Sequence, residues 1–355
     1  MIKMCKLYIV QLFISLLFYN CSNHPLTIVE QKNGCILDTD SLFNGNYLYG
    51  MNDNYIIMRS YDRDSLIYVS TIVGDSLKTN HSFLSKGQGP YDVNLISVNV
   101  DDSLLTILDV KGGKAFLIDY RIRSQKKDWV KINLSSKIRE TFTFGTSDIV
   151  WVDSVSFLFL GGQINSKNIL SIYNTKTGDV SPVEYWPNDG FKGEKMIKQM
   201  VYMSNSSLYH NKRMNRFLYK SGNGQLLELF DLKGRNFKTI GYICDEFPKY
   251  KLADDGLNYK LLYPNEKNYE IIEVSVNDSF IYLMSTPGIP HMEYKKYPFY
   301  YGDFISVYDW NGNKIKEFKT DIPFCTFVVD SNNEYLYTST IDNESGDDII
   351  IRYEL

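Results

Sequence analysis

The chain has 355 residues, a formal net charge of −4 at pH 7 and 15% aromatic residues, among them 28 tyrosines and 20 phenylalanines. Because basic residues are not in excess, a partner with a phosphate backbone is not expected, and no nucleic-acid binding is predicted. Aromatic residues favour strands, and the length fits either two average domains or one large all-β body.

The N-terminus is typical of an export signal. Lys3 and Lys6 precede an almost wholly apolar run over residues 7–19, which is too short to span a bilayer comfortably. Cys21 follows directly, and its position resembles the lipidation site of bacterial lipoproteins. We expect a signal peptide at 1–20, a lipid-anchor tether at 21–25 and a single domain at 26–355, held at the outer membrane of the cell envelope on either face. The alternative is an ordinary signal peptide with an incidental Cys21.

A short polar turn followed by an apolar run recurs along the rest of the chain. Five clear copies start at residues 52, 101, 153, 277 and 331, so the successive steps are 49, 52, 124 and 54 residues. The long step is about twice the others and is expected to hide one degenerate unit. A period of this size built from strands is typical of a propeller. The sequence therefore predicts an all-β, six-bladed β-propeller.

Each blade is expected to contain four antiparallel strands, running from the innermost to the outermost. The predicted strands are 46–51, 55–60, 66–73 and 78–85 in blade 1; 95–100, 104–109, 115–120 and 128–134 in blade 2; 148–153, 156–161, 169–174 and 179–186 in blade 3; 202–210, 216–220, 225–231 and 236–243 in blade 4; 270–276, 279–286, 303–310 and 313–320 in blade 5; and 325–330, 334–340 and 348–355 in blade 6. The last blade lacks an outer strand. Residues 26–31 (LTIVEQ) are a spare strand that would close the ring beside the C-terminal strand.

The connections are expected to differ between the two ends of the propeller. Turns between the first and second strands, and between the third and fourth, share one end, and four of them carry a glycine suited to positive φ: Gly74, Gly178, Gly234 and Gly312. The long connections at 86–94, 135–147, 187–201, 244–269, 287–302 and 341–347 all fall at the other end. A short helix is expected at 194–200. Because binding loops gather on one face of a rigid scaffold, the long-loop face is the predicted binding face.

The segment FLSKGQGPYD at 83–92 resembles the G-x-G-P-x-[DE] signature of TolB-like six-bladed propeller lipoproteins of Bacteroides-type bacteria. Hairpins such as ISVYDWNGN at 305–313 are similar to outer hairpins of the same family. The resemblance covers essentially the whole mature chain and implies the fold and an envelope location, but no activity. Its central residues are Lys86, Gly87, Gln88, Gly89 and Pro90, which could present N–H groups to an anion or form a tight link between blades. The absence of a following helix and of a phosphate-loop Lys-Ser/Thr favours the link.

The connection at 287–302 (PGIPHMEYKKYPFYYG) is the leading candidate for ligand contact. Its aromatic and basic side chains suit stacking on a flat ligand or a sugar, or anchoring a protein: His291, Tyr294, Lys295, Lys296, Tyr297, Phe299, Tyr300 and Tyr301. The alternative is a loop folded over the tunnel mouth, with its rings packed on the tops of the blades.

Catalytic and metal-binding motifs are absent from the linear sequence. HExxH, GxSxG, EF-hand and Walker patterns do not occur. The histidines beyond the leader are scattered, at His24, His81, His210 and His291. The remaining cysteines lack CxxC spacing, at Cys35, Cys244 and Cys325. We predict no metal, no cofactor and no disulfide framework.

The preferred hypothesis is a monomeric, envelope-anchored propeller that acts as a non-catalytic binding or scaffold module. It would hold a protein, a glycan or a small molecule on the long-loop face and contact the membrane only through the lipid anchor. The alternative is a carbohydrate-active hydrolase or lyase with its site in the central funnel. Two carboxylates close together in the funnel would favour the enzyme.

Overall fold

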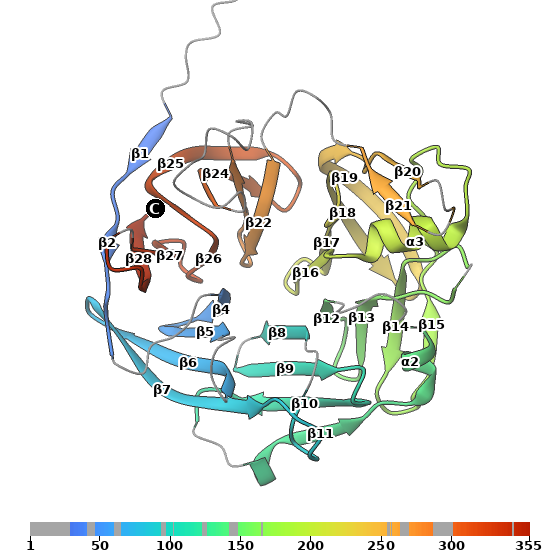
Figure 1. Ribbon diagram of the computed structural model, residues 1–355, viewed down its shortest axis with the longest axis horizontal. Helices are drawn as coiled ribbons and strands as arrows, with labels where there is room; N and C mark the ends of the chain where they lie inside the picture. Colours follow the sequence, from blue (N-terminus) through green and yellow to red (C-terminus); the bar gives the residue numbers. More distant parts are fainter. Residues whose placement is uncertain are drawn as a thin grey trace, which may run out of the picture. The chain divides into compact units, whose positions relative to one another are not determined.

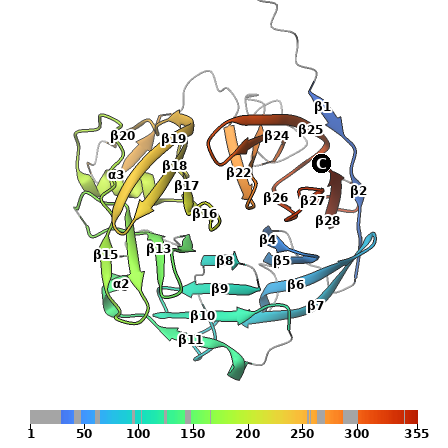
Figure 2. The same cartoon turned by 180° about the vertical axis from the view of Figure 1, so that it is seen from behind.

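The computed structural model describes residues 29–40, 47–59, 65–93, 97–101, 103–122, 126–141, 148–164, 166–253, 256, 258–262, 270–286, 301–342 and 344–355. The chain divides into two compact units, residues 1–30 and 31–355. The predicted leader and Cys21 lie outside the described residues. Within the second unit, six small sheets are arranged in a ring, seen from its two sides in Figures 1 and 2.

Each blade runs outward from a central strand, as predicted. Blade 1 contains β4 (Tyr47–Asn52), β5 (Tyr55–Arg59), β6 (Ser65–Val73) and β7 (Ser76–Ser85). Blade 2 contains β8 (Ser97–Asp101), β9 (Leu104–Asp109), β10 (Lys114–Asp119) and β11 (Val130–Asn133). Blade 3 contains β12 (Ile149–Trp151), β13 (Ser156–Leu160), β14 (Leu170–Asn174) and β15 (Val180–Pro182).

The second half of the ring repeats this order. Blade 4, the degenerate unit, contains β16 (Ser207–Asn211), β17 (Arg216–Lys220), β18 (Gln225–Lys233) and β19 (Asn236–Glu246), followed by a hairpin of β20 (Tyr250–Leu252) and β21 (Tyr259–Leu261). Blade 5 contains β22 (Glu270–Val276), β23 (Phe280–Thr286), β24 (Gly302–Asp309) and β25 (Lys314–Phe324). Blade 6 contains β26 (Thr326–Val329), β27 (Tyr335–Ile341) and β28 (Asp348–Glu354).

Among the described residues, helical segments are few and lie in the connections between strands. They are η1 (Lys126–Asp128), α2 (Ser136–Thr141) and α3 (Lys195–Met203). The short helix expected at 194–200 is therefore confirmed as α3, while α2 was not predicted. No helix among the described residues has both the length and the apolar character needed to cross a membrane.

The blades are held together by apolar side chains packed between neighbours. Among the described residues, the buried hydrophobic side chains form six clusters, and each cluster joins one pair of adjacent blades around the ring. A middle strand such as β13 is buried along its whole length, because neighbouring blades cover both of its faces. Burying each large apolar side chain contributes about 1.5–3 kcal/mol. This explains why the middle strands appear as continuous apolar runs in the sequence.

An N-terminal strand closes the ring, as predicted, but a different segment does so. β2 (Cys35–Ile36) pairs antiparallel with β28 and supplies the fourth strand of blade 6. The sequence pattern predicts residues 26–31 in this place, but the prediction is wrong, because β1 (Glu30–Lys32) lies beside β25 of blade 5. β3 (Asp38–Thr39) then pairs in parallel with β7 of blade 1. The closing segment thus follows the outer edges of three successive blades.

Local contacts explain the register of this closing segment. A Cβ atom at Gly34 would overlap the side chain of Ile351, so glycine allows the chain to pass close to β28. The Leu37 amide donates to the Ile350 carbonyl at 2.9 Å, and the Leu37 side chain is buried in the cluster between blades 6 and 1. Cys35 to Leu37 therefore gain ladder bonds beside β28, and Leu37 alone adds core burial.

The two ends of the propeller differ as expected, with one exception. Gly74, Gly178, Gly234 and Gly312 all have positive φ in short turns. The connection between β10 and β11, however, is long and contains η1, although it lies at the short-turn end. It carries the buried Trp129, whose ring contacts those of Phe83, Tyr91 and Phe116 edge-on. The extra length of this connection allows the Trp129 indole to pack in the core between blades 1 and 2.

Candidate functional site

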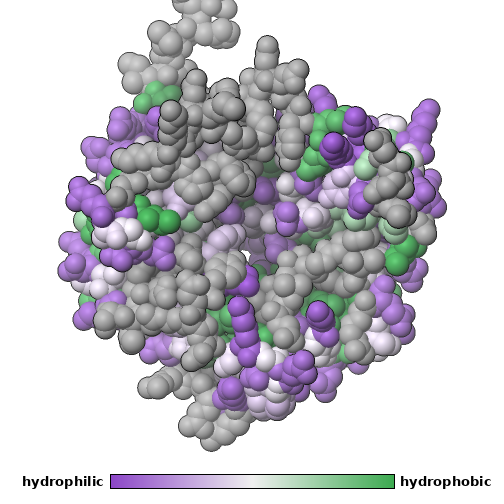
Figure 3. All heavy atoms as spheres, in the orientation of Figure 1, coloured by the Kyte–Doolittle hydropathy of each residue, from purple (hydrophilic) through white to green (hydrophobic). Residues whose placement is uncertain are grey.

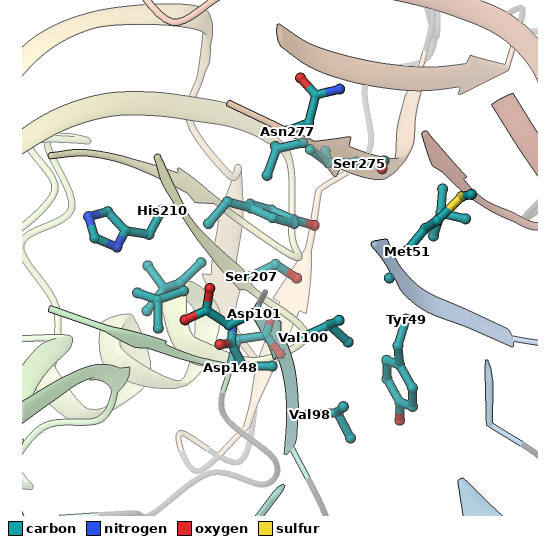
Figure 4. A pocket seen from close by; sticks show the side chains of 18 of the residues that line it. Tyr49, Met51, Val98, Val100, Asp101, Asp148, Ser207, His210, Ser275 and Asn277 are labelled. Carbon is teal, nitrogen blue, oxygen red and sulfur yellow. The ribbon is translucent and has the colours of Figure 1, made fainter. Parts of the chain in front are cut away.

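A cavity of about 480 Å³ lies at the centre of the ring, where the space-filling view is hollowed (Figure 3). Its walls come from the innermost strands of all six blades, namely β4, β8, β12, β16, β22 and β26. The volume is within the range of roughly 300–1,000 Å³ that is common for small-molecule sites. Figure 4 shows lining side chains from several blades, including Tyr49, Asp148, Ser207 and Asn277.

Polar side chains gather where the inner strands begin, at the long-loop end of the cavity. Tyr47 is the first residue of β4, Ser207 is the first residue of β16, and Asp148 directly precedes β12. The strand register adds two basic residues at the same level, because Tyr47 is opposite Arg59 and Ser207 is opposite Lys220. We call this group, together with Tyr49, Tyr209 and Glu273, the inner polar cluster.

Glu273 reaches the cluster from an irregular position in β22. The register between β22 and β23 shifts between Ile271 and Glu273, and such a bulge re-aims a side chain. The Tyr47 hydroxyl donates to Glu273 Oε2 at 3.2 Å, and the Val274 amide donates to Oε1 at 3.2 Å. Burial raises the pKa of Glu273, the nearby Asp148 raises it further, and Lys220 and the two hydrogen bonds oppose the change. The two carboxyl groups therefore interact electrostatically.

Asp148 is the second carboxyl group of the cluster. Burial raises its pKa to about 6, although hydrogen bonds from the Ser207 hydroxyl and the Leu208 amide, together with the Lys220 charge, favour the ionised form. At pH 7 most of the population is ionised. Asp148 is therefore a buried carboxylate, and its burial lowers the stability of the folded protein at pH 7.

Tyrosines supply neutral hydroxyl groups beside these carboxylates. The charge of Glu273, followed by burial, raises the pKa of Tyr47, and burial followed by Glu273 raises that of Tyr209. Both phenols stay protonated at neutral pH, so each can donate and accept hydrogen bonds. Tyr49 packs edge-on against Tyr47 at 5.3 Å between ring centroids and accepts a 3.1 Å hydrogen bond from Arg59 Nη1.

The other end of the cavity has a different character. The Lys212 ammonium pairs with the Asp101 carboxylate and so connects the turn after β16 with the end of β8. His210 stacks on Phe217 at 4.2 Å, and burial lowers the pKa of its imidazole. His210 is therefore neutral at pH 7, and it lies apart from His81, whose ring nitrogen contacts the Tyr120 carbonyl. Within the described part of the chain, no three His, Cys, Asp or Glu side chains are grouped to hold a metal ion.

Most of the predicted ligand-binding loop lies outside the described residues, and only its last two residues are described. Residues 287–300, and with them His291, Tyr294, Lys295, Lys296, Tyr297, Phe299 and Tyr300, lie outside the described residues. Tyr301 is described and is 2% exposed. Its side chain hydrogen-bonds the thiol of Cys325, so this ring belongs to the packing beside β24.

The GQGP motif forms a compact link between blades 1 and 2. The Asp92 carboxylate accepts a hydrogen bond from the Gly89 amide at 3.0 Å, and Cβ atoms at Gly87 or Gly89 would lie 2.6 Å from that carboxylate. Lys114 Nζ donates to the Gly89 carbonyl at 2.9 Å. These contacts support the structural interpretation of the motif, in which the glycines make room for the aspartate.

Replacing Asp92 with alanine is expected to lower the free energy of unfolding by about 1.5–3 kcal/mol, because a hydrogen bond to a charged group is lost. Denaturant unfolding of the purified protein measures this change. Asp347→Ala, at an exposed carboxylate in a turn, is the control and should stay within about 0.5 kcal/mol of the parent. Equal stability of the two variants would show that the aspartate does not hold the link.

Motif searching could not find the inner polar cluster, because its members are spread from Tyr47 to Glu273. A usable signal exists in the strand boundaries. In a propeller all inner strands begin at the same end, so the first residues of equivalent strands lie around one opening. Comparing the starts of the predicted inner strands would have grouped Tyr47, Asp148 and the region of Glu273.

Among solved structures, the chain is similar to a member of the DUF4221 family from Bacteroides vulgatus, with a TM-score of 0.59, 13% identity and coverage of 92% of this chain and 96% of that chain. It is also similar to a protein of unknown function from Bacteroides thetaiotaomicron, with a TM-score of 0.48, 11% identity and coverage of 90% and 75%. A third similar structure is the propeller domain of Cps50 (Swd1) from Myceliophteria thermophila. It has a TM-score of 0.44 and 9% identity, and the match covers 91% of this chain and 99% of that chain. At 13% identity, the likeness to the DUF4221 family member shows the fold alone.

No curated protein matches the chain at a significant level of sequence similarity. A family model described as "TolB-like 6-blade propeller-like" matches residues 52–332, which is most of the chain. The match includes the GQGP link between blades 1 and 2 and extends into blade 6. The resemblance inferred from residues 83–92 is thus confirmed, and the chain belongs to the TolB-like six-bladed propeller family.

Proposed function

We propose that the protein is a non-catalytic binding module that holds a small polar ligand in the central cavity, at its long-loop end. The observation that carries this proposal is the inner polar cluster. A cavity of about 480 Å³ presents two carboxyl groups and phenol hydroxyls from separate blades, and Lys220 of β17 interacts with both carboxyl groups. Burying Asp148 and Glu273 costs stability, as their raised pKa values indicate, and functional sites are where proteins tolerate such a cost.

The connection at 287–302 is proposed as a second contact for the same ligand or for a protein partner. It leaves β23 at Thr286 and returns to β24 at Gly302. The first strand of each antiparallel blade starts at the long-loop end, so the second strand ends there and the third strand starts there. Thr286 and Gly302 therefore both lie at the end of the propeller where the inner polar cluster is found. Aromatic residues with polar handles are frequent in binding loops.

Ligand binding can be tested by thermal unfolding of the full chain against a library of small sugars, amines, amino acids and carboxylic acids. We expect at least one class to raise Tm in a concentration-dependent way. Asp148→Asn and Tyr209→Phe should strongly reduce the rise at a given ligand concentration, and the triple variant Tyr297→Ala, Phe299→Ala and Tyr300→Ala should also reduce it. Asp179→Asn, at an exposed carboxylate directly before the outer strand β15, should leave it unchanged. A rise that survives the cavity substitutions would place binding elsewhere.

A hydrolase or lyase acting on carbohydrate is the second candidate, favoured by the electrostatic interaction of Asp148 with Glu273 in one cavity. Paired carboxyl groups with unequal environments are the usual acid and base of glycoside hydrolysis. Product formation from glycosides and polysaccharides, lost in both Asp148→Asn and Glu273→Gln, would replace the binding proposal with this one.

We also propose that the protein is exported and lipid-anchored at Cys21, on the evidence of the leader at residues 1–20. With Cys21→Ser, the protein is expected to move from the membrane fraction to the soluble fraction of the producing bacterium. Fractionation with mass spectrometry of the N-terminal peptide measures this. Cys35→Ser is the matched control, and an unchanged distribution of both variants would argue against the anchor.

A further inference from the structure

Resting on the proposed function, we infer that the ligand of the central cavity is a neutral, hydroxyl-rich molecule, of the chemical class of a saccharide unit. The inference depends on three features of the inner polar cluster, namely its balance of charge, its pattern of donors and acceptors, and the tyrosine rings that line the cavity.

The charges at the level of the inner polar cluster are balanced. Asp148 and Glu273 are opposed by Lys220, which interacts with both carboxyl groups. Arg59, at the same level in blade 1, adds a second cation behind Tyr49. Lys220 therefore offsets the attraction of a cationic ligand to the two carboxylates, whereas an anionic ligand would meet those carboxylates directly. Since like charges brought together in a desolvated site are strongly unfavourable, this arrangement favours a ligand without net charge.

The hydrogen-bonding groups suit hydroxyls. The Asp148 and Glu273 carboxylates accept, the phenol of Tyr209 can donate and accept, and the phenol of Tyr47, which donates its proton to Glu273, can still accept. Glu273 receives two hydrogen bonds from the protein, and a carboxylate offers about four acceptor positions, so acceptor capacity remains toward the cavity. A polyol is the neutral ligand whose every polar group both donates and accepts.

Aromatic side chains add a surface for the apolar faces of such a ligand. Tyr47, Tyr49 and Tyr209 all line the cavity. Their rings are rigid and largely apolar, while their hydroxyl groups stay hydrated or hydrogen-bonded. Carboxylates alternating with tyrosines around one opening thus provide both kinds of contact that a sugar ring needs.

The test measures binding by calorimetry of the full chain with three matched panels: neutral mono- and disaccharides, diamines, and dicarboxylates. We expect binding in the saccharide panel, weakened about 10- to 100-fold by Asp148→Asn, which removes a charged acceptor, and weakened also by Tyr209→Phe. The affinity for the saccharide should rise between pH 5 and pH 7, because Asp148 ionises in this range. The groups that act on its ionisation are Lys220, Glu273 and the Ser207 hydroxyl. The rise in affinity should be absent in Asp148→Asn.

The outcomes separate this inference from the function on which it rests. Binding of diamines or dicarboxylates, but not saccharides, with loss in the same variants, would overturn the ligand class and leave the cavity as a binding site. If the affinity for saccharides changed neither with the two substitutions nor with pH, the sugar would bind outside the inner polar cluster, and this result would also overturn the inference. Absence of binding in all three panels would count against both proposals.

Discussion

Replacing Lys198 with methionine is expected to lower the free energy of unfolding by about 3–5 kcal/mol, because the Asp189 carboxylate is then left buried without its cation. Lys198 Nζ lies 2.5 Å from Asp189 Oδ1, and both side chains are 3% exposed. The other carboxylate oxygen accepts hydrogen bonds from the hydroxyls of Tyr202 at 2.9 Å and Tyr250 at 3.0 Å. Urea unfolding at pH 7 gives the difference directly.

The exposed pair of Lys137 and Asp179 is the matched control for this experiment. Its side chains are 60% and 56% exposed, so Lys137→Met should cost less than about 1 kcal/mol. In the double variant Lys198→Met with Asp189→Leu, no charge is left buried, and the loss should be smaller than the sum of the two single losses. A Lys198→Met variant as stable as Lys137→Met would refute the role of the buried pair.

The buried pair of Lys198 and Asp189 also connects several segments of the long-loop face. Asp189 lies in the link between blades 3 and 4, Lys198 and Tyr202 come from α3, and Tyr250 belongs to β20. The ring of Phe191 adds a contact to Tyr250 at 4.5 Å. One carboxylate therefore ties three irregular segments to blade 4, close to where β16 enters the central cavity.

Replacing Asp148 with asparagine is expected to have the opposite effect and to stabilise the fold at pH 7. Burial raises the pKa of Asp148 from 3.8 to about 6. Because each pKa unit corresponds to about 1.36 kcal/mol, the ionised form carries a penalty of up to about 3 kcal/mol. The folded protein binds the proton more tightly than the unfolded chain does, so the penalty is complete above pH 6 and disappears below about pH 4. The same variant should lose ligand.

The pH dependence distinguishes this effect from a general change in packing. The stability difference between Asp148→Asn and the parent, measured by urea unfolding from pH 4 to pH 8, should grow as pH rises and level off above pH 6 to 7. Asp179→Asn is the control of opposite sign, because the hydrogen bond from Lys137 lowers the pKa of Asp179. A gain for Asp148→Asn that did not change with pH would rule out the electrostatic explanation.

The blades and their turns could be predicted from the sequence, whereas the closing strand and the cavity residues could not. The six blades could be predicted because a middle strand covered on both faces must carry a continuous apolar run at its centre, as in β13 and β17. The turn glycines could be predicted because positive φ excludes most other residues. The closing strand was assigned to the wrong residues, since two short extended segments near the N-terminus look alike in sequence and only the contacts of Gly34 and Leu37 with β28 distinguish them.

The sequence by itself determined the fold, the family and the face that carries the long connections, because these follow from local patterns of apolar runs, turns and glycines repeated along the chain. Only the tertiary structure decided that Tyr47, Asp148, Ser207 and Glu273 meet around one cavity. Each of them alone is an ordinary polar residue near the start of a strand. Closing the ring brings those starts together, and shared burial then changes their ionisation and gives them a common chemistry.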